Sequence, residues 1–63
     1  MRIKILRMSK NMTQEQLANK LNIQRSTVAM WETGEAMPRS DKLPLLAEIL
    51  NCSIADLFEE KTN

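Results

Sequence analysis

The sequence predicts an all-α fold, built as a compact bundle of five short helices. Residue types that favour helices, such as Leu, Ile, Met, Gln, Lys and Glu, are abundant, and no segment alternates as a strand would. One Gly and two Pro leave little loop, and only residues 34–39 are expected to form a longer connection. Asn followed by an apolar residue recurs after three helical patterns, which indicates helices that end in tight turns.

Residues suited to helix ends mark the boundaries. Asn11, Asn22 and Asn51 tolerate the left-handed backbone that closes a helix, and Gly34 adopts it freely. We expect helices near residues 2–10, 13–21, 24–33, 40–50 and 53–60.

The helix starts carry matching residues. The segment Thr13–Gln16 predicts a capping box, in which the Thr hydroxyl and the Gln side chain satisfy backbone N–H groups reciprocally. The segment Ser53–Asp56 is a weaker version of the same motif. Ser40 or Asp41 can cap the fourth helix, which places Pro44 in its first turn, where a missing N–H does least harm.

The chain of 63 residues predicts one domain, 1–63, with a tail at 59–63 that we expect to be frayed. A chain this short buries only about 60% of its unfolded surface, so it offers one small core. The apolar positions that recur at helical spacing should form that core: Ile3, Leu6, Met12, Leu17, Leu21, Ile23, Val28, Trp31, Leu43, Leu46, Ile49, Leu50, Ile54 and Leu57.

Composition argues against several classes of function. The chain has no His, no Gly-rich phosphate loop and no apparent carboxylate pair, so we expect no enzyme, no metal and no cofactor. The single Cys52 forms no internal disulfide, which suits a reducing cytoplasm. No apolar stretch reaches the ~20 residues of a membrane-spanning helix. We therefore expect a cytoplasmic protein without a membrane contact or a small-molecule ligand.

Charge is distributed unevenly along the chain. Residues 1–31 carry six basic side chains and one acidic side chain, a balance of +5. Residues 32–63 carry three basic and seven acidic side chains, a balance of −4. This asymmetry favours one cationic face that could meet a phosphate backbone, with an ordinary solvated surface as the alternative.

Residues 13–34 have the layout of a helix-turn-helix, two short helices joined by a tight turn. At about 100° per residue, Val28 and Trp31 of the second helix fall on the side that should face the core. The opposite side is small, slightly apolar and free of acidic residues; it carries Gln24, Arg25, Ser26, Ala29, Met30 and Thr33. A plain solvent-facing helix would carry paired Lys and Glu there instead.

This outer side has the chemistry that reads base edges in the DNA major groove. Arg25 can donate two hydrogen bonds to guanine, and Gln24 can pair with adenine. Ala29, Met30 and the methyl group of Thr33 can contact a thymine methyl. The alternative is that Ala29 and Met30 are buried against another part of the protein or against a second subunit.

The same residues resemble a known family. The chain supplies Thr13-Gln14, Leu17-Ala18, Leu21, Val28, Trp31-Glu32 and Gly34. In this pattern it is similar to the Xre/Cro-type helix-turn-helix of phage and bacterial repressors, and the similarity covers nearly the whole chain. The resemblance implies the lambda-repressor-like DNA-binding fold and a role in transcription regulation, as a repressor, in a bacterium or a phage.

The resemblance also implies roles for individual residues. Arg25, Ser26 and Met30 occupy base-reading positions, and Gln14 at a helix N-terminus would hold a phosphate. With it we expect phosphate contacts from Thr13, Thr33, Arg39 and Lys42. Arg7 and Glu32 resemble a buried ion pair between the first and third helices; two unrelated exposed charges are the alternative.

Two departures from the family pattern qualify these expectations. Gln24 stands where Ser or Thr commonly caps the recognition helix, so it serves contact rather than capping, or the helix begins less firmly. The segment Glu35–Met37 replaces a loop that is often basic in relatives, which suggests modest DNA affinity or a partner contact at Met37.

The expected partner is double-stranded DNA with a palindromic operator, bound by two copies of the chain. Phe58 is our candidate for the dimer contact, and core placement of its ring is the alternative. A function of a different class is an interaction module, such as an antitoxin or the partner of an anti-repressor, that uses the Ala29 and Met30 side or the segment Glu35–Met37 for protein.

Overall fold

A computed structural model describes residues 1–58, and the expectations for the tail at 59–63 and for the last two residues of the fifth helix lie outside them. The fold is all-α, as predicted, and residues 1–58 contain no strand. The helices are α1 (Ile3–Ser9), α2 (Gln14–Leu21), α3 (Arg25–Thr33), the 3₁₀ turn η1 (Ser40–Lys42), α4 (Leu43–Leu50) and α5 (Ile54–Phe58).

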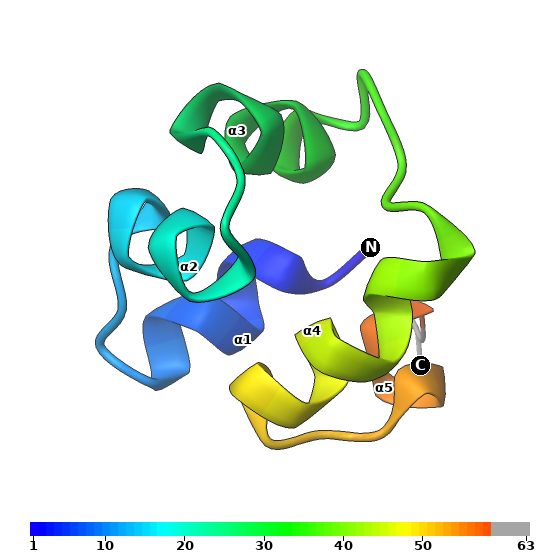
Figure 1. The fold of residues 1–63 in the computed structure, drawn as a ribbon. Helices are drawn as coiled ribbons and strands as arrows, with labels where there is room; N and C mark the ends of the chain where they lie inside the picture. Colours follow the sequence, from blue (N-terminus) through cyan, green and yellow to red (C-terminus); the bar gives the residue numbers. More distant parts are fainter. Residues whose placement is uncertain (59–63) are drawn as a thin grey trace.

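The helices form a bundle in which α2 packs against both α3 and α4 (Figure 1). The helix α1 contacts α3, and α5 contacts α4. The connection from α3 to η1 runs along the opposite side of the molecule from the turn that joins α1 and α2 (Figure 1). A backbone hydrogen bond of 2.8 Å from the Arg2 N–H to the Leu57 carbonyl ties the start of α1 to α5.

Three helices end as the sequence predicts. Asn11, Asn22 and Asn51 have positive φ values of 55°, 59° and 57°. The apolar residue after each Asn donates its N–H back into the helix; for example, Ile23 donates to the Ala18 carbonyl at 3.0 Å. Gly34, with φ 88°, ends α3. The short turns after α1 and α2 leave α3 in contact with both of these helices.

The helix starts are confirmed at two places and wrong at one. Thr13 and Gln16 form the reciprocal capping box of α2, and Ser53 and Asp56 form the same pair of bonds at α5. The side chains of Ser40 and Asp41 cap no helix. Residues 40–42 instead form a separate 3₁₀ turn, because α4 begins only at Leu43, with Pro44 in its first turn as expected.

The core is centred on α2, α3 and α4. Of the residues predicted for it, eight are buried: Ile3, Leu17, Leu21, Val28, Trp31, Leu46, Leu50 and Leu57. Five others are partly buried against them: Leu6, Met12, Ile23, Leu43 and Ile49. Ala18 and Ala47 complete the buried cluster and were not predicted. They belong to α2 and α4, two helices that pack against each other.

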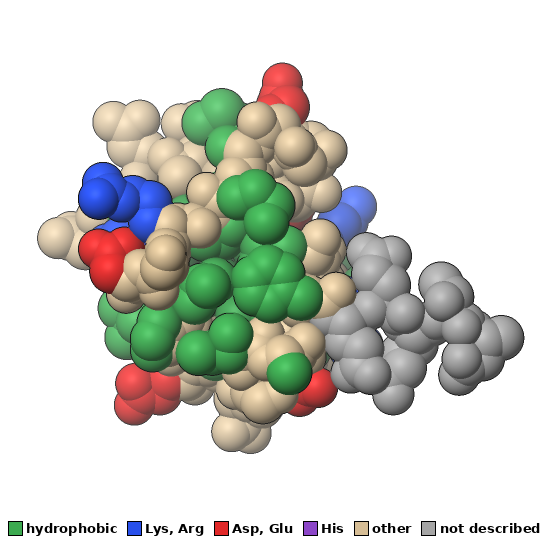
Figure 2. Space-filling view, turned by 90° about the vertical axis from the view of Figure 1, so that its right-hand side faces the viewer, with side chains coloured by type: hydrophobic (Ala, Val, Ile, Leu, Met, Phe, Trp, Pro, Cys, Tyr) green, Lys and Arg blue, Asp and Glu red, His purple; other side chains and the backbone are tan. Residues whose placement is uncertain are grey.

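The prediction for Ile54 is wrong, since this side chain is 41% exposed. The described part of α5 has five residues, and of these only Leu57 is buried. Phe58 is 43% exposed and so lies outside the core. Apolar side chains gather on the face that carries the loop after α3, η1 and α5 (Figure 2). The exposed large apolar side chains of these segments and of α4 are Met37, Leu45, Ile54 and Phe58, which we call the apolar face.

Candidate nucleic-acid interface

The two sides of α3 differ as the sequence predicts. Val28 and Trp31 are buried in the core. On the opposite side Gln24, Arg25, Ser26, Met30 and Thr33 are exposed, and Ala29 is half-buried. The one acidic residue of the helix, Glu32, is turned inward, with its side chain only 5% exposed. The outer side of α3 therefore presents no carboxylate to an approaching polyanion.

The start of α3 lacks a side-chain cap. Gln24 occupies the N-cap position in extended backbone and makes no capping hydrogen bond. Its Oε1 instead lies 3.4 Å from the Ser26 hydroxyl, a long bond on the exposed surface. The Gln24 amide is thus free to exchange its partner for a ligand, and it contributes little to holding the helix end.

Gln14 links the outer side of α3 to the interior. Its Oε1 accepts a hydrogen bond of 3.1 Å from Nη1 of Arg25. Its Nε2 donates a bond of 2.9 Å to Oε1 of Glu32. The chain of bonds therefore runs from exposed Arg25 through half-buried Gln14 to the Glu32 carboxylate. Since an amide nitrogen carries two protons, Gln14 keeps one donor for a further partner.

Arg7 and Glu32 lie against each other, α1 against α3, as the family resemblance implies. The Arg7 guanidinium donates to both Glu32 oxygens, at 2.6 Å and 3.2 Å, and also to the Met12 carbonyl at 2.7 Å. Arg7 is 8% exposed. Burial by itself would raise the pKa of the Glu32 carboxyl, but hydrogen bonds from Arg7 and Gln14 and the Arg7 charge outweigh it, so this pKa lies below its ordinary value. The Glu32 carboxylate therefore stays ionised near neutral pH, and it accepts the hydrogen bond that anchors Gln14.

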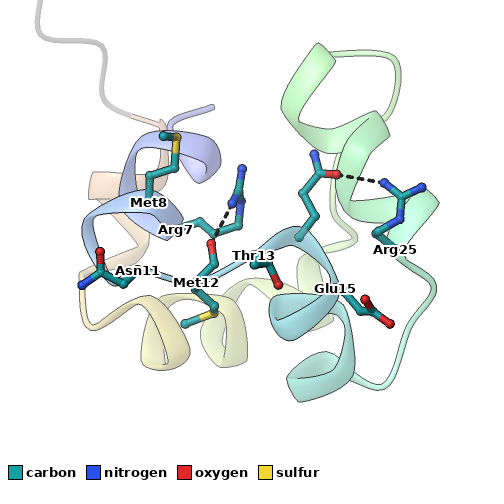
Figure 3. Close-up of a pocket in the computed structure, with 8 residues that line it drawn as sticks. Arg7, Met8, Asn11, Met12, Thr13, Glu15 and Arg25 are labelled. Carbon is teal, nitrogen blue, oxygen red and sulfur yellow. Dashed lines mark hydrogen bonds between the residues drawn. The ribbon is translucent and has the colours of Figure 1, made fainter.

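A shallow hollow opens between the end of α1 and the start of α2 (Figure 3). It is lined by Arg7, Met8, Asn11, Met12, Thr13, Gln14, Glu15 and Arg25. We call it the α2-start hollow. Two guanidinium groups and the first turn of α2 border it, and one carboxylate, Glu15, opposes them. The Arg25 guanidinium and the N-terminus of α2 suit an anion, whereas the Arg7 charge is already paired with Glu32.

The other expected phosphate contacts are less uniform. The Thr13 oxygen accepts from the Gln16 N–H at 3.0 Å, which leaves its hydroxyl proton available. The Thr33 hydroxyl is directed within the chain, to the Met30 carbonyl and to Glu35, each at 3.2 Å. Arg39 and Lys42 lie at η1, across the loop from α3, and Arg39 is 3.9 Å from Asp41. The structure thus brings Thr13, Gln14 and Arg25 together and leaves Arg39 and Lys42 apart from them.

Sequence reasoning missed the bonds that join Gln14 to Arg25 and to Glu32. These contacts cross from α2 to α3, and residues 11 and 18 positions apart carry no periodic pattern. The pattern located all three side chains in one motif but could not say which way the Gln14 amide turns.

Other chemistry is not apparent in the described part of the chain. Residues 1–58 hold no group of three metal-ligating side chains. Burial raises the pKa of the half-buried Cys52 thiol, with a smaller effect from Asp56 in the same direction, which disfavours the reactive thiolate. No helix among these residues is both long and apolar enough to cross a membrane.

Comparison with known proteins agrees with the fold. The chain matches the helix-turn-helix family model over residues 3–57. It is 36% identical over 53 residues to the HTH-type transcriptional activator BcrR of Enterococcus faecalis, covering 84% of this chain but 26% of the activator. Two uncharacterized HTH-type transcriptional regulators of Archaeoglobus fulgidus are 37% identical over 57 residues, covering 90% of this chain and 80% and 81% of theirs. No solved structure matches significantly.

A match that spans nearly all of the described residues defines the class of protein, a DNA-binding regulator of transcription. The chain belongs to the helix-turn-helix family, as the resemblance of its sequence implied. The proteins of this family bind DNA and are not enzymes, in agreement with the expected lack of catalytic activity. The chain corresponds to a small part of the activator from Enterococcus faecalis and to most of each archaeal regulator.

Proposed function

We propose that the chain binds a short palindromic sequence in double-stranded DNA as a homodimer, with α3 in the major groove, and represses transcription in the cytoplasm. Gln24, Arg25, Ser26, Ala29 and Met30 would contact base edges. Thr13 and Gln14 would hold a phosphate at the start of α2. Arg39 and Lys42 would meet the backbone farther along, and Thr33 would do so only after its present bonds are broken.

The observation that carries this proposal is the exposed, carboxylate-free outer side of α3, together with the bond from Gln14 to Arg25. A guanidinium that is held by one neutral acceptor keeps its other donors free and loses less conformational entropy when it meets guanine. The same Gln14 lies at the start of α2, where a phosphate would bind. One side chain would therefore couple backbone contact to base contact.

The experiment is selection of DNA from a random pool, followed by anisotropy titrations of Arg25→Ala against wild type. We expect Arg25→Ala to lose about 1–3 kcal/mol of discrimination at one guanine position, while preference at the other positions remains. Arg39→Ala is the matched control, because loss of a phosphate contact should weaken all sequences alike and reduce the salt dependence. An Arg25→Ala protein with unchanged preference would refute the recognition role of α3.

The homodimer is supported by the apolar face of Met37, Leu45, Ile54 and Phe58. Four large apolar side chains that are each at least 41% exposed are costly to leave in water on so small a domain. A two-fold pair through the apolar face would remove them from water, and to bind a palindrome it would have to present its two α3 helices to half-sites about 34–36 Å apart.

Phe58→Ser tests the dimer by sedimentation and by DNA binding. We expect a lower dimer mass fraction and weaker binding to the palindrome, with unchanged affinity for an isolated half-site. The control variant is Ile5→Ser, because Ile5 of α1 is 62% exposed and lies outside the apolar face. A Phe58→Ser protein that dimerises like wild type would remove Phe58 from the interface.

The same apolar face supports the second candidate, an interaction module that binds a different protein. Its distinguishing outcome is a monomer with tight protein binding and DNA affinity that is weak and independent of sequence. The direction of regulation is a separate question, because one relative is named an activator. A reporter gene behind the selected operator would answer it: repression is expected.

A further inference from the structure

A second hollow adjoins the α2-start hollow at the turn between α1 and α2. It is lined by Lys10, Asn11, Met12, Gln16, Asn19 and Lys20, and we call it the lysine hollow. The two hollows share Asn11 and Met12 as lining residues, so they adjoin at this turn. The function proposed above makes no use of the lysine hollow.

All the charged side chains that line the lysine hollow are basic. Two ammonium groups line it, and no acidic side chain does. Within residues 1–58 neither Lys10 nor Lys20 has a carboxylate within 4.0 Å, since the ion pairs there join Arg7 to Glu32 and Arg39 to Asp41. Both lysines are exposed, so their charges reach an approaching polyanion without loss of an existing pair.

The neutral residues of the lysine hollow add hydrogen-bond donors. The Gln16 carbonyl oxygen is already bonded to the Thr13 N–H at 2.8 Å, so the Gln16 amide nitrogen is left for other partners. Asn11 is fixed in left-handed backbone, and Met12 is packed partly into the core. The turn between α1 and α2 therefore carries donors and positive charge beside the partly buried Met12.

We infer that the lysine hollow binds the DNA backbone just outside the operator half-site, next to the phosphate held at the start of α2. The inference rests on the proposed function. Consecutive phosphates of one strand advance about 3.4 Å along the helix axis, so a strand that passes the α2-start hollow offers its next phosphates to an adjoining cationic surface. The contact would be independent of sequence and would add affinity on longer DNA.

The experiment compares two duplexes with the same operator, one that ends at the outer edges of the half-sites and one extended by about five base pairs on each side. Wild-type chain should bind the extended duplex more tightly. The double variant Lys10→Gln/Lys20→Gln should lose this gain, and its log–log salt slope on extended DNA should fall by about 0.9 for each phosphate contact removed. Binding to the short duplex should change little.

Lys4→Gln is the matched control, because Lys4 is an exposed lysine of α1 that lines neither hollow. It should keep the gain on extended DNA. The inference is overturned if wild type and the double variant show the same gain in affinity on extended DNA and the same salt slope. That result is also the one expected if these lysines bind a protein instead of DNA. Failure of the proposed function differs visibly: the wild type itself would then show no preference for any selected operator.

Discussion

The starts of α2 and α3 have nearly the same backbone and opposite side-chain chemistry. Thr13 before α2 has φ −82° and ψ 165°, and Gln24 before α3 has φ −81° and ψ 147°. Thr13 and Gln16 exchange two hydrogen bonds that cap the N-terminus of α2. Gln24 makes no such bond, and its amide lies at the surface beside Ser26.

If the proposed function holds, this difference divides the polar residues at the two helix starts between stability and DNA recognition. The start of α2 uses its cap to fix the helix and leaves Gln14 to reach across to α3. The start of α3 forgoes its cap and keeps Gln24 and Arg25 exposed. Both starts depend on Glu32, because Gln14 binds it directly and Arg25 binds Gln14.

Removal of this shared anchor should have the largest effect. Glu32→Ala leaves the Arg7 guanidinium buried without its carboxylate, and we expect a loss of about 3–5 kcal/mol in the free energy of unfolding. That loss is comparable with the whole stability of a domain of this size. Urea titration followed by fluorescence of the single, buried Trp31 measures it.

Two further variants separate stability from positioning. Glu48→Ala, at an exposed acid of α4, should stay within about 0.5 kcal/mol of wild type. Arg7→Met/Glu32→Leu replaces the pair by apolar side chains, which is often neutral for stability. In this variant the Gln14 amide loses the Glu32 oxygen as its acceptor. The variant should therefore fold but bind operator DNA less tightly than wild type. Full affinity in it would show that Glu32 does not position Gln14.

The Glu32 pair also predicts an acid limit to stability. The pKa of the Glu32 carboxyl is lowered in the folded state, so its contribution is present above the unfolded pKa, near 4.5, and is lost as the pH falls through the folded value. The free energy of unfolding of wild type should therefore fall more steeply than that of Glu32→Gln below about pH 4.5. Parallel pH profiles of the two proteins would contradict the assigned cause.

Much of the fold followed from local patterns in the sequence. Two kinds of local feature involve residues at most six positions apart: the left-handed Asn11, Asn22 and Asn51, and the Thr13 capping box. Such short-range features can be predicted from the sequence directly. The two sides of α3 followed from helical periodicity in the same way. These features were sufficient to predict a helix-turn-helix and its exposed side.

Contacts between elements were less accessible. Both Ile54 and Leu57 fit the apolar pattern of α5. In the described part of this helix only Leu57 is buried, and the pattern alone does not predict which of the two that will be. The separation of η1 from α4 depends on how the loop after α3 packs as it leads into η1. The Gln14 bonds depend on the crossing of two helices. Such features are set by packing, which short-range patterns do not encode.

Thr13→Ala tests the capped N-terminus of α2. It removes one side-chain acceptor from the first turn of α2, and we expect a loss of about 1 kcal/mol in stability. DNA affinity should fall as well, because the hydroxyl proton of Thr13 is also a proposed phosphate donor. Thr13→Ser retains the hydroxyl and should restore both quantities. A stable Thr13→Ala protein would mean that the capping box contributes nothing measurable.

The uncapped end gives the smallest and most discriminating test. Gln24→Ser supplies a hydroxyl at the N-cap of α3, and we expect the free energy of unfolding to rise by about 0.5 kcal/mol. The shorter side chain can no longer reach an adenine, so preference at one base position should weaken while the preference set by Arg25 remains. A variant that gained stability and kept every base preference would show that Gln24 is an imperfect cap and not a contact. A variant that lost preference without gaining stability would show that α3 begins firmly without a cap.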